Sequence, residues 1–229
     1  MQKETIKVAI VSDVACPWCY VGKRRLEAAI KKWKGTHVSV TWHPYQLDSN
    51  IPAEGLDRNT YLTNKFGNLE RIHEMTERLI EAGTDEGITF NFGEKWLAVN
   101  TLPLHQLLHV AGEEGFKSTL KERFLKAYFD ENLHLNDTTV LHTIMNEFGW
   151  DAEKTSGIIA DENIAYTVKQ EIAHYRQRGV TGVPFFIIND KYGISGAQSP
   201  DVFLDVFAQV SSVQTIREGD SCDPVSGEC

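Results

Sequence analysis

The sequence predicts an α/β fold, in which a four-stranded mixed sheet is interrupted by a large all-helical insertion. Three patterns predict it. Residues 1–55 contain a strand, a helix and a strand; residues 56–178 show helical periodicity with little strand signal; and residues 179–213 contain two strands and a helix. We therefore expect the first and last segments to form one discontinuous domain, and residues 214–229 to form a flexible tail.

The first segment predicts a parallel strand-helix-strand unit. Residues 6–11 are apolar on both faces, which is typical of a strand in the middle of a covered sheet. A helix is expected from about residue 17 to 34, because Leu26, Ile30 and Trp33 share one face and Gly35 follows them. Alternation from Val38 predicts the second strand, which runs to about residue 47.

The remaining segments differ in periodicity. The insertion has stripes of apolar residues at helical spacing, such as Leu69, Ile72, Met75 and Leu79. Strand character returns at residues 184–189 and 192–195, and the turn residues between them predict a hairpin. A short helix is expected at about residues 200–210, which completes the second half of the sheet domain.

Composition excludes some functions and predicts a compartment. The chain has 229 residues, 41% of them hydrophobic, and a formal net charge of −9. This charge argues against nonspecific nucleic-acid binding, and no apolar run is long enough to span a bilayer. The first residues lack the longer apolar region and the small-residue cleavage site of a signal peptide, so we expect a cytoplasmic, reducing compartment. A Cys-x-x-Cys motif there is more often catalytic or metal-binding than structural.

The predicted redox centre is the segment Cys16-Pro17-Trp18-Cys19 at the start of the first helix. Cysteines three apart lie on one face of the first turn, within reach of a disulfide. The helix N-terminus carries partial positive charge, so we expect a lowered pKa for Cys16. Cys16 is predicted to attack and Cys19 to resolve the mixed disulfide. Pro17 stiffens the turn and Trp18 supplies an apolar wall.

Two cysteines near the end of the chain bear on a metal-site alternative. A four-cysteine zinc site needs a second closely spaced pair, but six residues separate Cys222 from Cys229. The redox interpretation of Cys16 and Cys19 is therefore favoured over a metal site. Cys222 and Cys229 could form a second redox pair that relays with the first, a local disulfide, or two free thiols.

A second signal is the segment Thr181-Gly182-Val183-Pro184 before the third predicted strand. Glycine, an aliphatic residue and proline at a strand start favour a cis peptide bond before Pro184 when a redox helix is also present. This arrangement would expose the backbone of Val183 to an extended substrate and place the Pro184 ring beside the sulfurs.

Three segments carry a resemblance to a known family. They are Asp13-Val14-Ala15-Cys16-Pro17-Trp18-Cys19-Tyr20-Val21-Gly22, Gly182-Val183-Pro184-Phe185-Phe186 and Ile194-Ser195-Gly196-Ala197-Gln198. The chain resembles the DsbA-like thioredoxin superfamily, and more narrowly its FrnE-type dithiol–disulfide oxidoreductases. The resemblance implies a thioredoxin-like fold, disulfide exchange with thiol-containing proteins or small thiols, and a site at Cys16, Cys19 and Pro184. No resident cofactor is expected, although glutathione could serve as a reductant. The Pro-Trp dipeptide differs from the Pro-His of the periplasmic oxidases, which argues against strong oxidant behaviour.

An alternative within the same fold is the group of kappa-class glutathione transferases and hydroxychromene-carboxylate isomerases. These proteins typically carry serine at the position of Cys16, so the Cys pair favours redox chemistry. In the alternative, Asn100, Thr101 and His105 could line a small-ligand pocket. Capping by Asn100 or Thr101 and a packed or surface His105 are the favoured interpretations. Asp13 is expected to support the turn before the helix.

Overall fold

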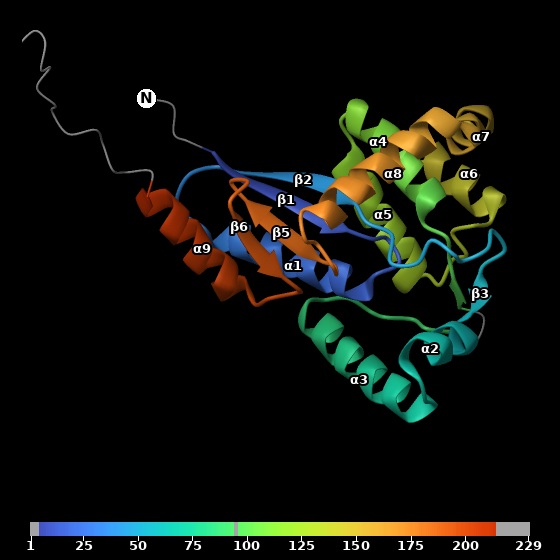
Figure 1. Ribbon diagram of the computed structural model, residues 1–229, viewed down its shortest axis with the longest axis horizontal. Helices are drawn as coiled ribbons and strands as arrows, with labels where there is room; N and C mark the ends of the chain where they lie inside the picture. Colours follow the sequence, from blue (N-terminus) through green and yellow to red (C-terminus); the bar gives the residue numbers. More distant parts are fainter. Residues whose placement is uncertain (1–4, 94–95, 214–229) are drawn as a thin grey trace, which may run out of the picture.

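The four predicted strands form one mixed sheet in the computed structural model, which describes residues 5–93 and 96–213 (Figure 1). The sheet order is β2-β1-β5-β6, with β1 and β2 parallel and the other neighbours antiparallel. This arrangement confirms the predicted fold class. The strands are β1 (Ile6–Ser12), β2 (Val38–Pro44), β5 (Phe185–Ile188) and β6 (Tyr192–Ser195).

The central strand β1 is covered on both faces, as its sequence predicts. Ile6, Val8 and Ile10 pack in one apolar cluster with residues of α1 (Pro17–Lys32) and α9 (Pro200–Val213). Val11 belongs to a different cluster, together with residues that include Tyr175 of α8 (Glu162–Gln177). Successive side chains of a strand point to opposite faces, so the double apolar pattern places β1 in the middle of the sheet.

The insertion is mostly helical but contains a short strand pair that the sequence analysis did not predict. Strand β3 (Leu56–Asp57) pairs antiparallel with β4 (Leu97–Ala98), so the insertion is not all-helical. Two-residue strands are too short to give a periodic signal, and their pairing depends on segments about forty residues apart. This strand pair brings together the two ends of the segment that contains α2 (Arg58–Phe66) and α3 (Leu69–Asp85).

The insertion has two unequal parts. The large apolar core contains most of the buried residues of α4 to α7, and α8 packs between this core and β2. In contrast, α2 has no buried residue and α3 has three, so the α2–α3 hairpin (residues 58–85) packs loosely against the rest (Figure 1). The remaining helices are α4 (Leu102–Glu113), α5 (Lys117–Phe129), α6 (Thr138–Asn146) and α7 (Ala152–Ala160).

Several local predictions can be checked against the elements. The hairpin between β5 and β6 is confirmed: Asn189 and Asp190 have φ values of 49° and 57° and occupy the centre of a tight turn that the Lys191 N–H closes by donating to the Ile188 carbonyl oxygen. Strand β2 ends at Pro44 rather than near residue 47, because the Leu47 N–H donates to the Asp13 carboxylate instead of extending the ladder. None of the helices in residues 5–93 and 96–213 has the length and hydrophobicity needed to cross a membrane.

Candidate active site

The cysteine pair lies where the sequence places it, at the N-terminus of α1. Cys16 is the N-cap residue, Pro17 is the first helical residue, and the Cys19 N–H donates to the Cys16 carbonyl oxygen at 3.0 Å. Both thiols are free, and the two residues are only 4% and 1% exposed. The pair is therefore within the first turn of a helix, largely shielded from water, with Cys16 the more accessible of the two.

The predicted cis peptide bond before Pro184 is present, and it lies beside the cysteines. The Cys16 thiol donates to the Val183 carbonyl oxygen at a sulfur–oxygen distance of 3.4 Å. Gly22 allows this approach: a Cβ atom there would lie 3.0 Å from Pro184 Cγ and 3.1 Å from Phe186. Cys16, Val183 and Pro184, which are far apart in the sequence, thus form one site.

A layer of buried polar and charged side chains lies behind the cysteine pair. Asp13, His105 and Lys121 are 1%, 3% and 1% exposed. His105 Nε2 lies 2.8 Å from the Tyr45 carbonyl oxygen and 3.3 Å from Asp13 Oδ1, while the Leu47 N–H donates to Asp13 Oδ2 at 2.8 Å. Asp13 also accepts from the Ala15 N–H. The carboxylate therefore supports the turn before α1, as predicted, and joins that turn to the insertion.

The environment of these groups sets their charges. Burial would raise the pKa of Asp13, but the hydrogen bonds from His105 and from the Leu47 N–H, together with the charge of Lys121, outweigh it and lower that pKa. Burial lowers the pKa of His105, so the imidazole is neutral at pH 7 and Nε2–H acts as a donor. Burial also lowers the pKa of Lys121 to about 8, partly offset by the nearby cysteines and Asp13. The layer thus holds a carboxylate, a neutral imidazole and an ammonium.

The predicted lowering of the Cys16 pKa is not found in this arrangement. Hydrogen bonding to Cys19 and burial raise the pKa of Cys16 well above its ordinary value. Burial opposes ionisation of Cys19 as well, but the hydrogen bond from Cys16 and the charge of Lys121 lower the Cys19 pKa. The two thiols differ because Cys16 is buried against Cys19, whereas Cys19 also lies near the buried Lys121 ammonium. The first negative charge of the pair is therefore favoured on Cys19.

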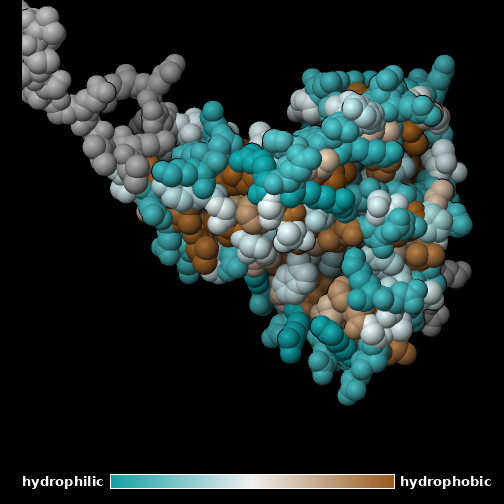
Figure 2. Space-filling model, viewed as in Figure 1, coloured by the Kyte–Doolittle hydropathy of each residue, from teal (hydrophilic) through white to brown (hydrophobic). Residues whose placement is uncertain are grey.

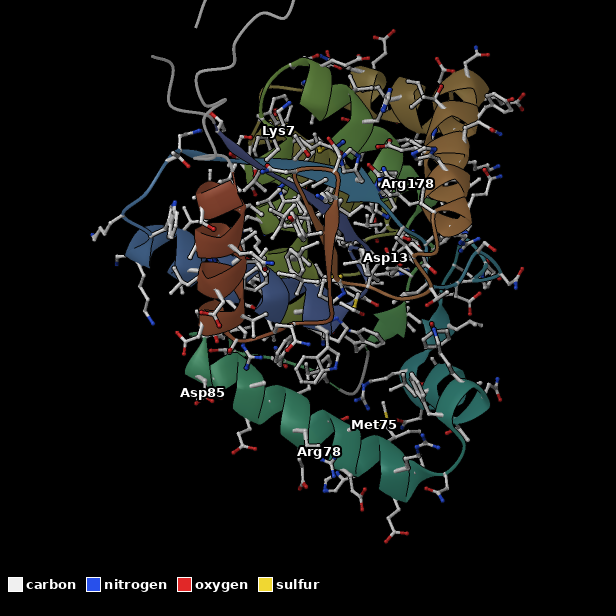
Figure 3. The ribbon with its side chains drawn as sticks, turned by 60° about the vertical axis from the view of Figure 1, so that its left-hand side comes forward. Lys7, Asp13, Met75, Arg78, Asp85 and Arg178 are labelled. Carbon is white, nitrogen blue, oxygen red and sulfur yellow. The ribbon has the colours of Figure 1, made fainter. Side chains whose placement is uncertain are left out.

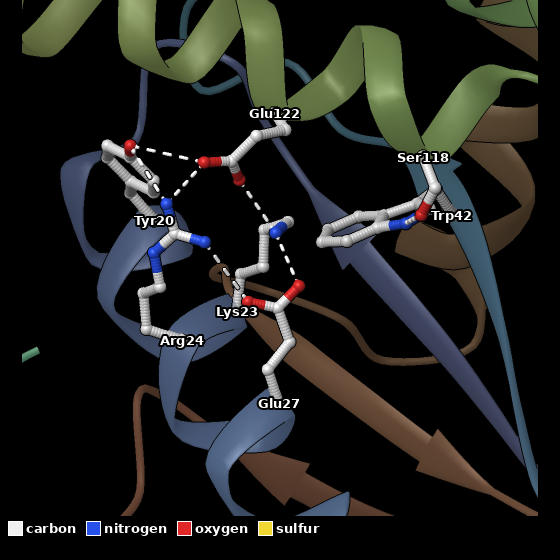
Figure 4. A network of polar contacts seen from close by, with 7 residues as sticks. All are labelled: Tyr20, Lys23, Arg24, Glu27, Trp42, Ser118 and Glu122. Atoms are coloured by element: carbon white, nitrogen blue, oxygen red, sulfur yellow. Dashed lines mark hydrogen bonds and ion pairs between the residues drawn. The ribbon is translucent and has the colours of Figure 1, made fainter. Parts of the chain in front are cut away.

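A polar network fixes α1 against α5 behind the site (Figure 4). Lys23 pairs with Glu122 at 2.6 Å and with Glu27 at 2.5 Å, and Arg24 pairs with both glutamates. The Tyr20 hydroxyl lies 3.4 Å from Glu122 Oε1. These contacts join the helix that carries the cysteines to the helix that carries Lys121, which keeps Cys19 and the ammonium in register.

Other predicted residues have varied outcomes. Pro17 and Trp18 line a cavity next to Cys16, and Trp18 is 37% exposed. Asn100 accepts from the Leu102 N–H at the start of α4, in agreement with the capping interpretation, and His105 is packed rather than exposed. Cys222 and Cys229 lie outside the described residues. Within residues 5–93 and 96–213, no group of three or more His, Cys, Asp or Glu side chains is arranged to hold a metal ion.

Sequence reasoning missed two parts of the site. Lys121 was not singled out, because a lone lysine among the apolar residues of a helix is normally exposed. The cavity beside Cys16 was missed because α2 and α3 come to it from a distant segment. One signal was present: Lys121 lies three residues before Phe124 and four before Leu125, which places it on the apolar side of α5.

Comparisons with known proteins identify the family and the fold. The sequence matches the DSBA-like thioredoxin domain family over residues 7–208. It is similar to the crystal structure of a probable DsbA oxidoreductase from Streptomyces coelicolor, with 32% identity, a TM-score of 0.85, and 97% of each chain covered.

Two more distant structures share the fold. One is the Pseudomonas aeruginosa protein DsbM, described as a cytosolic disulfide reductase and solved with GSH. It is 15% identical with a TM-score of 0.62, covering 89% of this chain and 98% of DsbM. The other is a 2-hydroxychromene-2-carboxylate isomerase, 14% identical with a TM-score of 0.66, covering 91% of this chain and 96% of the isomerase.

Proposed function

The chain belongs to the DsbA-like thioredoxin family, and from this premise we propose that it is a thiol–disulfide oxidoreductase acting through Cys16 and Cys19. One observation carries the proposal: two free thiols share the first turn of α1, one beside an open cavity and the other near a buried ammonium. The first can meet a substrate sulfur, and the second is held ready to displace it.

The proposed reaction begins with a proton transfer inside the pair. Cys16 gives its proton to the Cys19 thiolate, attacks a disulfide RS–SR′, forms the mixed disulfide Cys16–SR and releases R′S⁻. Cys19 then loses the proton to solvent or to the released thiolate, attacks the Cys16 sulfur and releases RS⁻. The substrate gains two electrons and the protein dithiol becomes a disulfide. The reverse sequence oxidises a substrate dithiol.

Lys121 acts on the second step of this sequence. Its charge lowers the pKa of Cys19, so more of the resolving thiolate is available at neutral pH. The charge of Asp13 raises the pKa of Lys121 and so favours the ammonium, and His105 contacts the Asp13 carboxylate. In this proposal they are positioning residues, because they act on the cysteines through the turn and through Lys121.

The dithiol must be regenerated, and we propose that a small thiol such as glutathione does so, with no resident cofactor. Two thiol molecules would be oxidised to one disulfide for each protein disulfide reduced. The neighbour DsbM, solved with GSH and described as cytosolic, supports this reductant and a cytoplasmic location. The Pro17-Trp18 dipeptide supports the FrnE-type assignment and a reductase or isomerase role.

The test is reduction of insulin by dithiothreitol, together with refolding of a protein that has scrambled disulfides. We expect the chain to accelerate both, Cys16→Ser to abolish both, and Cys19→Ser to accumulate a mixed disulfide at Cys16. Full activity of Cys16→Ser would contradict the proposal. Glutathione conjugation to an electrophile that survives Cys19→Ser would instead place the chain with the kappa-class transferases.

A further inference from the structure

A cavity of about 320 Å³ lies beside Cys16, between the N-terminal turn of α1 and the α2–α3 hairpin. Cys16, Pro17 and Trp18 form one wall. Figure 2 shows the surface hollowed between α3 and the sheet-containing part, with pale and brown residues gathered there. The opposite walls are largely apolar and rich in aromatic rings, and they include Tyr61, Leu62, Phe66, Ile72, Phe92 and Phe129.

The shape of the cavity indicates a small ligand. Neither Val183 nor Pro184 lines it, so it extends from Cys16 away from the segment where an extended substrate backbone would pair. A volume of this order is typical of sites that enclose a small organic molecule. The apolar lining would leave peptide bonds and ammonium groups without hydrogen-bond partners, which disfavours a polar tripeptide such as glutathione as its occupant.

One cation in the wall is oriented but not neutralised. Arg58 Nη2 donates to Thr76 Oγ1 at 2.8 Å, and the guanidinium lies 5.0 Å from the centre of the Phe92 ring. The Thr76 hydroxyl donates its own hydrogen bond to the Ile72 carbonyl oxygen, so toward Arg58 it can only accept.

Arg58 lacks a carboxylate partner in the described part of the chain, unlike the arginines that form ion pairs there. Arg24, Arg25 and Arg123 pair with glutamates, whereas Arg58 has no carboxylate within 4.0 Å among residues 5–93 and 96–213. A guanidinium with free donors at an apolar cavity fits a carboxylate, which it can bind through two hydrogen bonds. Lys65 also lines the cavity and adds positive charge.

We propose that this cavity binds small thiols or disulfides that combine an apolar aryl or alkyl body with a carboxylate. The body fills the aromatic lining, the carboxylate binds Arg58, and the sulfur reaches Cys16. The sulfur step rests on the proposed function: Cys16 forms Cys16–SR, one RS⁻ leaves, and Cys19 then releases the second RS⁻. The protein dithiol supplies both electrons.

Binding is tested apart from redox chemistry in the double variant Cys16→Ser/Cys19→Ser. Trp18 and Trp96 line the cavity, so tryptophan fluorescence reports its occupation. We expect octanoate to bind about tenfold more tightly than octanol, because a charge-assisted hydrogen bond is stronger than a neutral one. From butanoate to octanoate, affinity should rise by roughly fourfold for each added methylene group. Equal affinity for acid and alcohol, or no dependence on length, would overturn the proposal.

Two matched variants locate the carboxylate. Arg58→Gln should abolish the preference for octanoate over octanol. Arg78→Gln removes the same charge from an exposed residue on the side of α3 that faces away from the rest of the protein (Figure 3), and should keep the preference. Loss of the preference in both variants would show a general charge effect, and would overturn the assignment to Arg58.

The exchange step is tested on the chain with both cysteines. Dithiobis(nitrobenzoate) is an aromatic disulfide with two carboxylates, and dithiodipyridine is an aromatic disulfide without them. The ratio of their rates should fall about fivefold in Arg58→Gln and stay constant in Arg78→Gln. Octanoate should slow the reaction of the protein with dithiobis(nitrobenzoate), and S-methylglutathione at the same concentration should not. The methylated form is used because the free thiol of glutathione would itself reduce dithiobis(nitrobenzoate).

The two proposals fail in different ways. Octanoate binding without any disulfide exchange supports the cavity site and contradicts the proposed function. Exchange without octanoate binding, or equal protection by S-methylglutathione, leaves the proposed function and overturns the cavity proposal. The cavity proposal is also overturned if octanoate does not bind but a peptide with an apolar residue beside its cysteine does. That result would assign the cavity to a polypeptide substrate.

Discussion

On the α4–α5 side of the cysteine pair the side chains are closely packed and charged groups are buried, whereas the α2–α3 side is an apolar cavity. Both sides come from the same insertion, but they differ in burial. Phe124 of α5 is fully buried, while Met75 of α3 is 37% exposed. Separate segments therefore control two properties of one site. Side chains of α4 and α5 influence the ionisation of the sulfurs, and α2 and α3 line the cavity through which a ligand could reach Cys16.

The largest expected effect is the loss of stability when a core side chain is removed from the closely packed α4–α5 side. Phe124→Ala removes a buried ring from the main core and should lower the free energy of unfolding by about 3–5 kcal/mol. Met75→Ala, at the rim of the cavity, should lower it by less than about 1 kcal/mol. Urea denaturation followed by circular dichroism measures both. Similar losses in the two variants would show that the α2–α3 hairpin contributes to the core as much as α5 does.

The next effect concerns the charge behind Cys19. Lys121→Met should raise the Cys19 pKa and make the reduction potential of the pair more negative by about 10–30 mV, because the thiolate of the reduced form loses a stabilising charge. Equilibration with a glutathione buffer gives the potential, and thiolate absorbance gives the pKa. Lys126→Met, an exposed lysine of the same helix, is the control and should change neither. An unchanged potential in Lys121→Met would remove Lys121 from the mechanism.

The comparison also indicates how much of the site can be predicted from the sequence. The CPWC helix start and the hairpin at Asn189 depend on residues within a few positions of each other, and the cis bond before Pro184 is predicted from its neighbours together with the CPWC motif. The structure contains all three. The hydrogen bond between Asp13 and His105 joins residues 92 positions apart. Such contacts depend on how helices of the insertion are oriented, which periodicity does not specify.

The error in the predicted Cys16 pKa has the same origin. The prediction considered the helix N-terminus alone, which is a local property of the chain. In the folded chain, hydrogen bonding to Cys19 and burial raise the pKa of Cys16, while the Lys121 ammonium, which comes from a distant segment, helps to lower the pKa of Cys19. Together these contributions reverse the expected order of ionisation within the pair. A charge at a redox centre therefore has to be assigned from the folded neighbourhood.

A smaller effect is the pH dependence that His105 gives to stability. Burial lowers its pKa in the folded chain, whereas the unfolded chain takes up a proton below about pH 6.5. The unfolded state then binds more protons, so the free energy of unfolding falls as the pH falls. Between about pH 6.5 and pH 5 this contribution amounts to at most about 2 kcal/mol. His105→Gln, whose amide can still donate to Tyr45, should show a shallower fall.

The control for this pH effect is His73→Gln, an exposed histidine of α3 with its side chain 76% accessible. It should retain the pH dependence of the unaltered chain, because this imidazole is in contact with solvent in both the folded and the unfolded state. Denaturation in urea at about pH 7 and about pH 5 gives the difference for each protein. A parallel fall in His105→Gln and the unaltered chain would mean that His105 takes up its proton without unfolding.

The smallest expected effect is on the attachment of α3. Arg25 of α1 pairs with Glu86 at 2.9 Å and donates to the Ala197 carbonyl oxygen at 2.6 Å, so it joins the end of α3 to the sheet-containing part. Glu86→Gln should lower the free energy of global unfolding by less than about 1 kcal/mol, because the pair is partly exposed. Amide hydrogens of α3 should nevertheless exchange up to about fivefold faster, since local opening of this helix requires the pair to break. Amides of α5 should be unaffected. Equal acceleration in α3 and α5 would show that the two sides of the cysteine pair open together, and would remove the distinction between them.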